Sequence, residues 1–191
     1  MNGHLPEREK LRKIIHLIFG VIILLLIAFL GTEISRLIIA IALLIGIIAS
    51  ILIMRGCKLP LLQKIVEKAE RENEKHFPGR AAVFFFASAL ILLTLFQTNP
   101  QLIIAALSVQ VFADSAAALI GIKYGKHKLI GKKSWEGSIA CFIIATICIN
   151  FYYPLPMAII TALAATIIEA IPLDDNLLVP LVAGITLKLL I

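Results

Sequence analysis

The chain has 191 residues, 60% of them hydrophobic, and its mean hydropathy is +1.00. Soluble domains are about 45–50% apolar, so this composition excludes an ordinary soluble domain and favours a single membrane-embedded domain over residues 1–191. The net charge of +6 is of a kind found in nucleic-acid-binding proteins. Here, however, the lysines and arginines fall between the apolar runs, which indicates membrane topology and anionic headgroups or phosphates, not nucleic acid.

Apolar runs long enough to cross a bilayer recur along the whole chain. They cover approximately residues 14–30, 37–54, 81–97, 101–121, 138–153, 156–172 and 177–191. We therefore predict an all-α fold, namely a polytopic integral membrane helical bundle of about seven transmembrane helices. A further helix is predicted over 59–77, where an apolar stripe suits either the membrane surface or a solvated connector.

Positive charge alternates between successive connecting segments. The N-terminal tail and segments 55–80 and 122–137 are rich in lysine and arginine, whereas the segments between them are nearly free of positive charge. The positive-inside rule then places the tail and the loops 55–80, 122–137 and 173–176 in the cytosol. This orientation predicts a multi-pass cell-membrane protein with a cytosolic N-terminus. It also brings the intramembrane acids Asp114 and Glu169 toward the cytosolic face, where we expect the active site.

Asp114 is the most unusual residue of the apolar runs. A charge at the centre of a transmembrane helix costs about 2.5–3.5 kcal/mol or more, so an acid kept there is a functional candidate. Asp114 is a ligand for a divalent cation, a base near a substrate hydroxyl, or an acid hydrogen-bonded to other helices for packing. Because Mg²⁺ prefers oxygen ligands and bridges substrate phosphates, the first two roles predict phosphate chemistry at the membrane face.

A loop rich in glycine and lysine follows Asp114. Its candidate nucleotide-binding residues are Gly121, Gly125, Gly131, Lys132, Lys133, Ser134, Glu136 and Gly137. Bare backbone N–H groups and lysine charges suit a polyphosphate, and Lys132 and Lys133 are also catalytic candidates. Ser134 either binds a phosphate or caps the next helix, and Glu136 holds a lysine or a cation. An ordinary positive-inside loop would explain the lysines but not the glycines.

Two basic groups flank the same predicted face. Arg12, Lys13 and His16 are three or four residues apart and share one side of a helix. One interpretation is a phosphate-binding clamp in which His16 is a candidate base for a lipid hydroxyl. The other is a set of basic residues that flanks the first apolar run and extends its charges to the membrane surface. Arg80 follows a Pro-Gly turn. It either binds a phosphate through two N–H groups of its guanidinium or is an ordinary positive residue beside the next apolar run.

A second acidic group lies near the end of another apolar run. Glu169 precedes the helix-breaking Pro172, and two acids follow it. Glu169 and Asp175 are therefore candidate metal ligands beside Asp114. The alternative is an exposed turn in which Asp175 or Asn176 caps the last helix.

Together these motifs resemble those of the dolichol kinase, phytol kinase and CTP-dependent diacylglycerol kinase family. The matching stretches are Arg12-Lys13-x-x-His16, Pro78-Gly79-Arg80, Ala113-Asp114-Ser115, Gly121-x-x-x-Gly125, Lys132-Lys133-Ser134-x-Glu136-Gly137-Ser138, Glu169 and Asp175-Asn176. The resemblance implies CTP as the phosphate donor, Mg²⁺ as the cofactor, and transfer of the terminal phosphate to a polyprenol or another lipid alcohol. It also implies that Asp114 and the glycine–lysine loop bind the nucleotide and the metal.

The resulting hypothesis is a CTP-dependent lipid-alcohol kinase whose partners are CTP, a membrane lipid alcohol and the bilayer. Asp114, with Glu169 or Asp175, would hold Mg²⁺, while the lysines and Arg80 would stabilise the transferring phosphoryl group. The alternative enzyme is a CTP-dependent cytidylyltransferase that makes a CDP-lipid at the same face. A small transporter with Asp114 and Glu169 as an ion path is a third alternative, but it needs polar groups through the outer half. There the sequence offers only Gln97, Gln110, Asn150 and hydroxyl groups.

Overall fold

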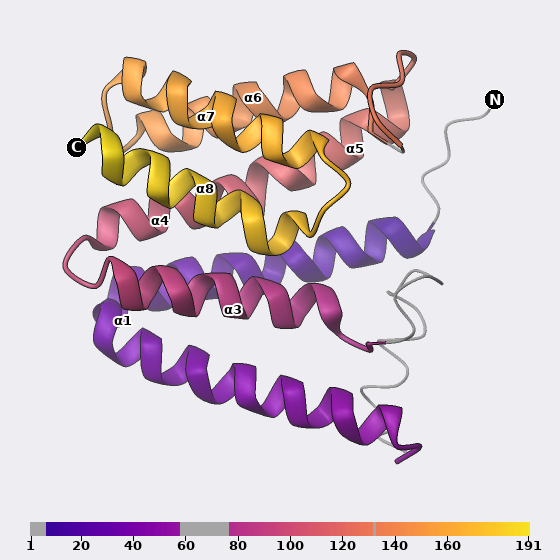
Figure 1. Ribbon diagram of the computed structural model, residues 1–191, viewed down its shortest axis with the longest axis vertical. Coiled ribbons are helices and arrows are strands. Elements are labelled where there is room, and N and C mark those ends of the chain that lie inside the picture. The colour runs from indigo at the N-terminus through magenta and orange to yellow at the C-terminus, as the bar shows by residue number, and fades with distance from the viewer. Residues whose placement is uncertain (1–6, 58–76, 132) are drawn as a thin grey trace.

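A computed structural model describes residues 7–57, 77–131 and 133–191. In this part of the chain, helices joined by short turns make up the regular structure, apart from an isolated antiparallel bridge between Lys128 and Ser134. The elements in Figure 1 are α1 (Glu7–Met54), α3 (Arg80–Leu95), α4 (Pro100–Ser108), the π-helical turn η2 (Val109–Ala113), α5 (Asp114–Tyr124), α6 (Trp135–Asn150), α7 (Leu155–Ala170) and α8 (Asp175–Leu190). The predicted all-α class is confirmed, whereas the predicted helix over 59–77 lies, except for Phe77, outside the described residues.

The first long helix is a helical hairpin. α1 reverses at Gly31, whose φ of +76° is left-handed and non-helical. Because glycine has no Cβ, it adopts this conformation without steric cost. The two halves of α1 run antiparallel along the bundle (Figure 1). Helix resumes directly after Gly31, so the turn is shorter than the predicted connection over 31–36.

The predicted run 101–121 forms one rod with an irregular middle turn. α4, η2 and α5 follow one another without a break, and the rod continues to Tyr124. At the end of η2, the backbone N–H of Asp114 donates to Val109 O, five residues back, and not to Gln110 O as in an α-helix. π turns are rare in proteins, and those that do occur are frequently found at functional sites. This one lies immediately before Asp114.

The rod of α4 and η2 lies at the centre of the bundle. Its buried side chains include Leu102, Leu107 and Val111, and α1, α3, α6 and α8 pack around it. Burial of such side chains contributes roughly 1.5–3 kcal/mol each. The α1 backbone approaches so closely at Gly20 that an added Cβ would meet Val111 Cγ2 at 2.4 Å. The first half of α1 is thereby held directly against the turn that precedes Asp114.

The outer faces of the helices are strongly apolar. Phe29 and Leu163, for example, are 80% and 53% exposed. Outward apolar faces of this kind suit a lipid environment. By length and composition, the described stretches that could cross a membrane are Leu11–Met54 and Pro100–Tyr124, and the shorter apolar helices are Arg80–Leu95, Trp135–Asn150 and Leu155–Ala170. The predicted number of transmembrane helices and the cytosolic N-terminus stay predictions.

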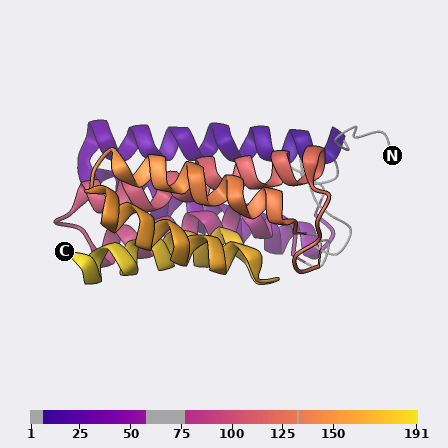
Figure 2. The same ribbon diagram turned by 90° about the horizontal axis from the view of Figure 1, so that it is seen from above.

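The connecting segments sort to the two ends of the bundle. Figure 1 shows the α5–α6 loop, the α7–α8 turn, the first turn of α1 and the start of α3 at one end. The reversal of α1, the α3–α4 turn and the α6–α7 turn lie at the other end. Figure 2, seen from above, shows the helices running roughly parallel or antiparallel to one another between these two ends. The described parts of the segments that the charge pattern assigned to one side therefore share one end of the molecule.

Candidate active site

Polar side chains from α1, η2, α5, α7, α8 and the α5–α6 loop meet inside the bundle. We call this set the polar cluster. It consists of Lys13, His16, Gln110, Asp114, Lys133, Glu169, Asp175 and Asn176. α1 and α8 both pack against the central rod, so residues from the two ends of the sequence come together here.

Asp114 faces the interior of the bundle and pairs with Lys13 of α1. The Lys13 Nζ lies 2.5 Å from Asp114 Oδ2 and 3.4 Å from the Asp114 backbone oxygen. Lys13 and Asp114 are only 8% and 4% exposed. Removing one partner of a buried ion pair costs about 3–5 kcal/mol, because the remaining charge is left uncompensated. The pair therefore fixes α1 to the rod at this position.

His16 lies beside the same turn. Its Nε2 is 3.2 Å from the backbone oxygen of Gln110, the carbonyl that the Asp114 N–H bypasses in the π turn. Because a carbonyl only accepts, Nε2 carries a proton in this contact. In a neutral imidazole the other nitrogen, Nδ1, is then the free acceptor. The contact with the π turn thus leaves Nδ1 as the ring nitrogen that can accept a proton, and the role of His16 as a base stays a prediction.

Gln110 belongs to the polar cluster. The sequence instead predicts it among the few polar groups of the outer half of the membrane, so that prediction is corrected. Its Nε2 donates to Asn176 Oδ1 of α8 at 2.8 Å. Gln110 is fully buried, and its Oε1 has no hydrogen-bond partner among the described residues. The signal in the sequence is spacing: Gln110 precedes Asp114 by four residues, so both lie on one helix face.

Lys133 joins two further acids. Its Nζ donates to Glu169 Oε1 and lies 3.2 Å from Asp175 Oδ2. Burial lowers the pKa of Lys133, but the carboxylates of Asp175 and Glu169 outweigh this effect and hold that pKa above its ordinary value. Lys133 is therefore charged at neutral pH. Glu169 is 2% exposed, and its Oε2 has no partner in the described part of the chain.

The acids of the cluster fall into two groups, each facing a lysine. Asp114 faces Lys13, whereas Glu169 and Asp175 share Lys133, so the carboxylates exceed the ammonium groups by one charge. Among the described residues, no three acidic, histidine or cysteine side chains could hold a metal ion together. The metal role of these acids stays a prediction. Their chemistry fits Mg²⁺, because that ion usually takes one or two carboxylates plus substrate phosphates, and Glu169 Oε2 is an unused oxygen.

The two arginines that the sequence assigns to phosphate have different surroundings. Arg80 pairs with Asp174, the residue directly before Asp175, and so borders the polar cluster. Arg12 pairs with Glu9 of its own helix at 2.8 Å. The structure therefore brings Arg80 to the edge of the cluster and directs Arg12 elsewhere.

Two predicted helix caps can be compared with the structure. Ser134 Oγ accepts from the Gly137 N–H at 3.2 Å and caps α6, which is one of its two predicted roles. The N-cap residue of α8 is Asp174, without a side-chain cap bond. This corrects the predicted cap at Asp175 or Asn176.

The glycines around the α5–α6 loop allow close packing. A Cβ added at Gly125 would meet Ser134 Oγ, at the start of α6, at 2.7 Å, and one added at Gly137 would meet Ala117 O of α5 at 2.8 Å. Larger residues would force α5 and α6 apart, since packed interiors leave no room for them. Gly131, by contrast, has a φ of +58° and open space around it. The nucleotide contacts of these glycines stay predictions, and the structure adds a packing reason for those at the α5–α6 contact.

Glu136 lies at the exposed start of α6. Its Oε1 is 2.8 Å from His127 Nδ1. Hydrogen bonds from its own backbone N–H and from the His127 side chain lower the pKa of Glu136 to about 2. Its partner in the structure is thus a histidine and not the predicted lysine, and the predicted cation stays a prediction. Lys132, the other catalytic lysine of the prediction, lies outside the described residues.

Comparison with known proteins shows which protein family this chain resembles. Residues 6–173 match the family model described as the Cytidylyltransferase family. An uncharacterized protein of Methanocaldococcus jannaschii is 33% identical over 184 residues, which cover 93% of this chain and 91% of its own length. The probable chloroplastic phytol kinase 1 of Oryza sativa subsp. japonica is 29% identical over 97% of this chain. The CTP-dependent diacylglycerol kinase 1 of Schizosaccharomyces pombe is 27% identical over 68% of it. No solved structure matches the chain.

These matches include the residues that build most of the site. The matched family segment runs from the first turns of α1 past Glu169, and so contains Lys13, Asp114 and Lys133. The chain spans 66% of the rice protein and 68% of the S. pombe protein. The predicted resemblance is confirmed: the chain belongs to the Cytidylyltransferase family, and the relatives to which it is similar include phytol kinases and a CTP-dependent diacylglycerol kinase.

Proposed function

We propose that this protein is a CTP-dependent kinase that transfers the terminal phosphate of CTP to a membrane polyprenol or another isoprenoid or lipid alcohol. The observation that carries the proposal is the polar cluster, in which two lysines and three carboxylates lie within an otherwise apolar bundle. Such charges are expensive inside a membrane protein and mark functional sites. The names of the rice and S. pombe relatives support CTP as the donor and a lipid alcohol as the acceptor.

In this proposal the acids bind Mg²⁺ and the basic groups bind phosphate. Asp114, with Glu169 or Asp175, would hold the ion, which would supply positive charge to the phosphates of CTP. The residues proposed to neutralise phosphate oxygens are Lys13, Lys132, Lys133 and Arg80. Arg12 would join them only by leaving its partner Glu9. Preorganised charges of this kind account for most of the catalysis in phosphoryl transfer, because little covalent chemistry is left for the protein.

His16 is the proposed acceptor of the hydroxyl proton. Its Nε2 is engaged with the Gln110 carbonyl, so Nδ1 is the atom that takes the proton. The alcohol oxygen then forms a bond to the γ-phosphorus of CTP, the bond to the β–γ bridging oxygen breaks, and CDP leaves. Asp114 is the alternative base.

The α5–α6 loop is the proposed binding site for the rest of the nucleotide. Its residues in this role are Gly121, Gly125, Gly131, Ser134, Glu136 and Gly137. The loop lies at the same end of the bundle as the start of α3 and the α7–α8 turn (Figure 1). A nucleotide on this loop would therefore direct its phosphates toward Lys133, the loop residue that belongs to the polar cluster.

Labelled CTP tests the proposal directly. The purified chain in phospholipid vesicles is incubated with Mg²⁺, γ-labelled CTP and a panel of prenols, phytol, dolichol and diacylglycerols. We expect the label in one of the lipid alcohols, and the labelled lipid then identifies the acceptor. Absence of CTP-dependent label from every alcohol would contradict the kinase.

A cytidylyltransferase that makes a CDP-lipid is the second candidate, because the matching family is described by that activity. Its acceptor is a lipid phosphate, and the β- and γ-phosphates of CTP leave as pyrophosphate. α-Labelled CTP would then label the lipid, whereas γ-labelled CTP would not. The two labels therefore separate the reactions in one experiment.

A further inference from the structure

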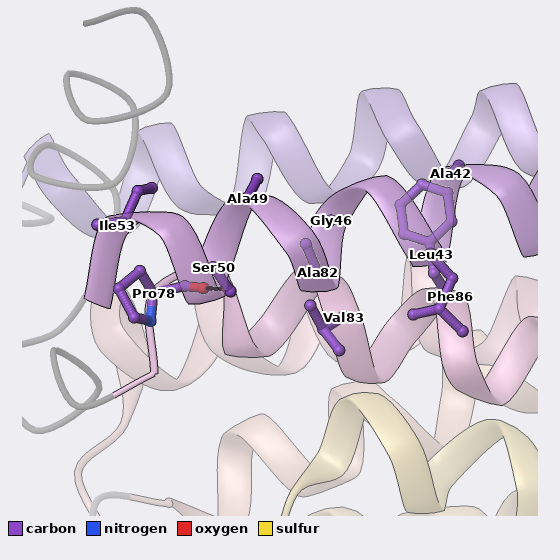
Figure 3. Close-up of a pocket in the computed structure, with 11 residues that line it drawn as sticks. Ala42, Leu43, Gly46, Ala49, Ser50, Ile53, Pro78, Ala82, Val83 and Phe86 are labelled. Carbon is purple, nitrogen blue, oxygen red and sulfur yellow. Dashed lines mark hydrogen bonds between the residues drawn. The ribbon is translucent and has the colours of Figure 1, made fainter. Parts of the chain in front are cut away.

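A narrow groove runs between the second half of α1 and the start of α3. Figure 3 shows its lining residues, and its volume is about 160 Å³. It follows α1 from Ala42 to Ile53, a length of about 16 Å at the rise of an α-helix. Small residues such as Gly46, Ala49 and Ala82 form much of its walls. The groove is therefore long relative to its cross-section.

The groove is not a consequence of close helix packing at Gly46. An added Cβ there would lie 3.9 Å from Val83, an ordinary contact, whereas a Cβ at Gly184 would meet Leu92 at 2.6 Å. A glycine within a helix is destabilising relative to alanine. At Gly46 the two helices do not approach more closely, so no tighter packing compensates for this loss of stability. The missing side chain leaves space that belongs to the groove.

The side chains of the groove offer no free polar group. Ser50 Oγ donates to Pro78 O, as the dashed line in Figure 3 shows, and the other lining side chains are apolar. A ligand with hydrogen-bonding groups along its length would leave them unsatisfied here. The groove therefore suits a hydrocarbon chain, and its two walls, each a single helix, enclose one chain.

One end of the groove adjoins the polar cluster. Pro78 and Gly79 form this end, and the next residue, Arg80, pairs with Asp174 beside the cluster residue Asp175. An amphipathic ligand with its tail in the groove would thus have its polar end beside a guanidinium group and the cluster. The groove and the cluster together provide an apolar and a charged subsite for one molecule.

We propose that this groove binds one hydrocarbon chain, the tail of the acceptor alcohol. The inference rests on the proposed kinase function for the chemistry at the headgroup. A groove between two helices encloses one chain, whereas the second chain of a diacylglycerol would lie outside it.

Substitutions that fill the groove test this proposal. Gly46→Leu places a side chain in the groove, and Gly46→Ala, whose Cβ has room, is the mild matched variant. Ile45→Phe adds bulk at the neighbouring position, which is 60% exposed, and is the control. With the full chain in vesicles, we expect Gly46→Leu to raise KM for a long-chain prenol about tenfold. The kcat/KM of Gly46→Leu for a short-chain prenol should stay within about twofold of the wild-type value. In Ile45→Phe, the KM for the long-chain prenol and the kcat/KM for the short-chain prenol should both stay within about twofold of wild type.

Equal loss for long and short prenols in Gly46→Leu, with an unchanged unfolding temperature, would overturn the groove as a tail site. If Gly46→Leu lowers the unfolding temperature, Ala82→Leu fills the groove from the opposite wall and is held to the same criterion.

Photocrosslinking provides a measurement that needs no turnover. A prenol with a diazirine in its tail is irradiated in vesicles that contain the protein, and a diazirine-labelled phosphatidylcholine reports bulk lipid. Prenol labelling of the groove walls should exceed that of the phospholipid and fall in Gly46→Leu, and equal labelling by both probes would overturn the proposal. Specific prenol labelling without CTP-dependent phosphorylation would contradict the kinase alone. Phosphorylation without specific labelling would contradict the groove alone.

Discussion

Two polar regions near opposite ends of the bundle are built differently. The polar cluster is largely buried and joins α1 to η2, whereas the second region connects the reversal of α1 to the α3–α4 turn. We call the second region the polar clamp; it consists of Thr32, Glu33, Arg36 and Gln97. Arg36 Nη1 donates to Gln97 Oε1 at 2.8 Å, and Gln97 Nε2 donates to Glu33 Oε1 at 3.0 Å. Thr32 Oγ1 donates to the Gln97 backbone oxygen at 3.0 Å.

The clamp satisfies its own polar groups, and the cluster does not. One guanidinium and one carboxylate balance in the clamp, and both ends of the Gln97 amide are bonded. In the cluster, carboxylates exceed ammonium groups, and Gln110 Oε1 and Glu169 Oε2 are buried without partners among the described residues. An unpaired buried acceptor costs about 1–3 kcal/mol. This difference supports a structural role for the clamp and the proposed ligand-binding role of the cluster.

Asp114→Asn should have the largest effect. We expect CTP-dependent phosphorylation to fall about 10³-fold or more, because an amide neither balances Lys13 nor binds Mg²⁺ as a carboxylate does. Transfer from γ-labelled CTP measures the loss, and thermal unfolding in detergent checks the fold. Normal turnover by this variant would remove Asp114 from the mechanism.

The double variant Lys13→Met/Asp114→Asn serves as the control for stability. Asp114→Asn alone leaves the Lys13 charge buried without its partner, whereas the double variant removes that charge. We expect the double variant to regain much of the unfolding temperature while turnover stays lost. Recovery of turnover together with stability would mean that Asp114 acts only in packing.

Lys133→Met should have the next largest effect. We expect turnover to fall about 10²- to 10³-fold, as when one preorganised donor to a developing charge is removed. Lys126→Met, at an exposed position of the same loop, is the matched control and should leave turnover unchanged. Equal losses in both variants would mean that loop charge in general, and not the position of Lys133 between two acids, supports the reaction.

The same pair of variants differs in the pH dependence of stability. The folded-state pKa of Lys133 is raised, so its contribution to stability is present below the ordinary lysine pKa and is lost as the pH rises through the raised value. Wild type and Lys126→Met should therefore lose stability at strongly alkaline pH by an increment that Lys133→Met lacks. Identical alkaline profiles for all three proteins would contradict the ion pairs of Lys133.

His16→Gln tests the atom assigned as base. Glutamine retains an N–H for the Gln110 carbonyl but has no ring acceptor, so we expect a fall of about 10²-fold in turnover with little change in unfolding temperature. ¹⁵N NMR of the wild-type protein checks the tautomer, and the proton of neutral His16 should reside on Nε2. A proton on Nδ1 would contradict the contact with the Gln110 carbonyl as the orienting bond.

Sequence patterns predicted the helices and the acidic residues of the cluster for a physical reason. Charges within or beside apolar runs are rare and expensive, so Asp114 and Glu169 are conspicuous, and the charge pattern assigned their loops to one side. Pairing across helices is not visible in this way. Lys13 looks like any residue of a basic flank until α1 packs against η2. Gln110 is visibly polar within its apolar run, but its residue type does not show that Asn176 is its partner. The π turn likewise has no local signature.

Gln97→Met should have the smallest effect and test the clamp. The substitution removes two side-chain hydrogen bonds near the surface and leaves no buried charge without a partner. We therefore expect the free energy of unfolding to decrease by about 0.5–1.5 kcal/mol. Gln101→Met, at an exposed position nearby, should change neither stability nor turnover. Turnover of Gln97→Met should equal that of wild type, because the Lys13–Asp114 pair fixes α1 at the cluster independently of the clamp. A large loss of turnover with a small loss of stability would mean that the reversal of α1 controls the position of Lys13, and the two polar regions would then act as one.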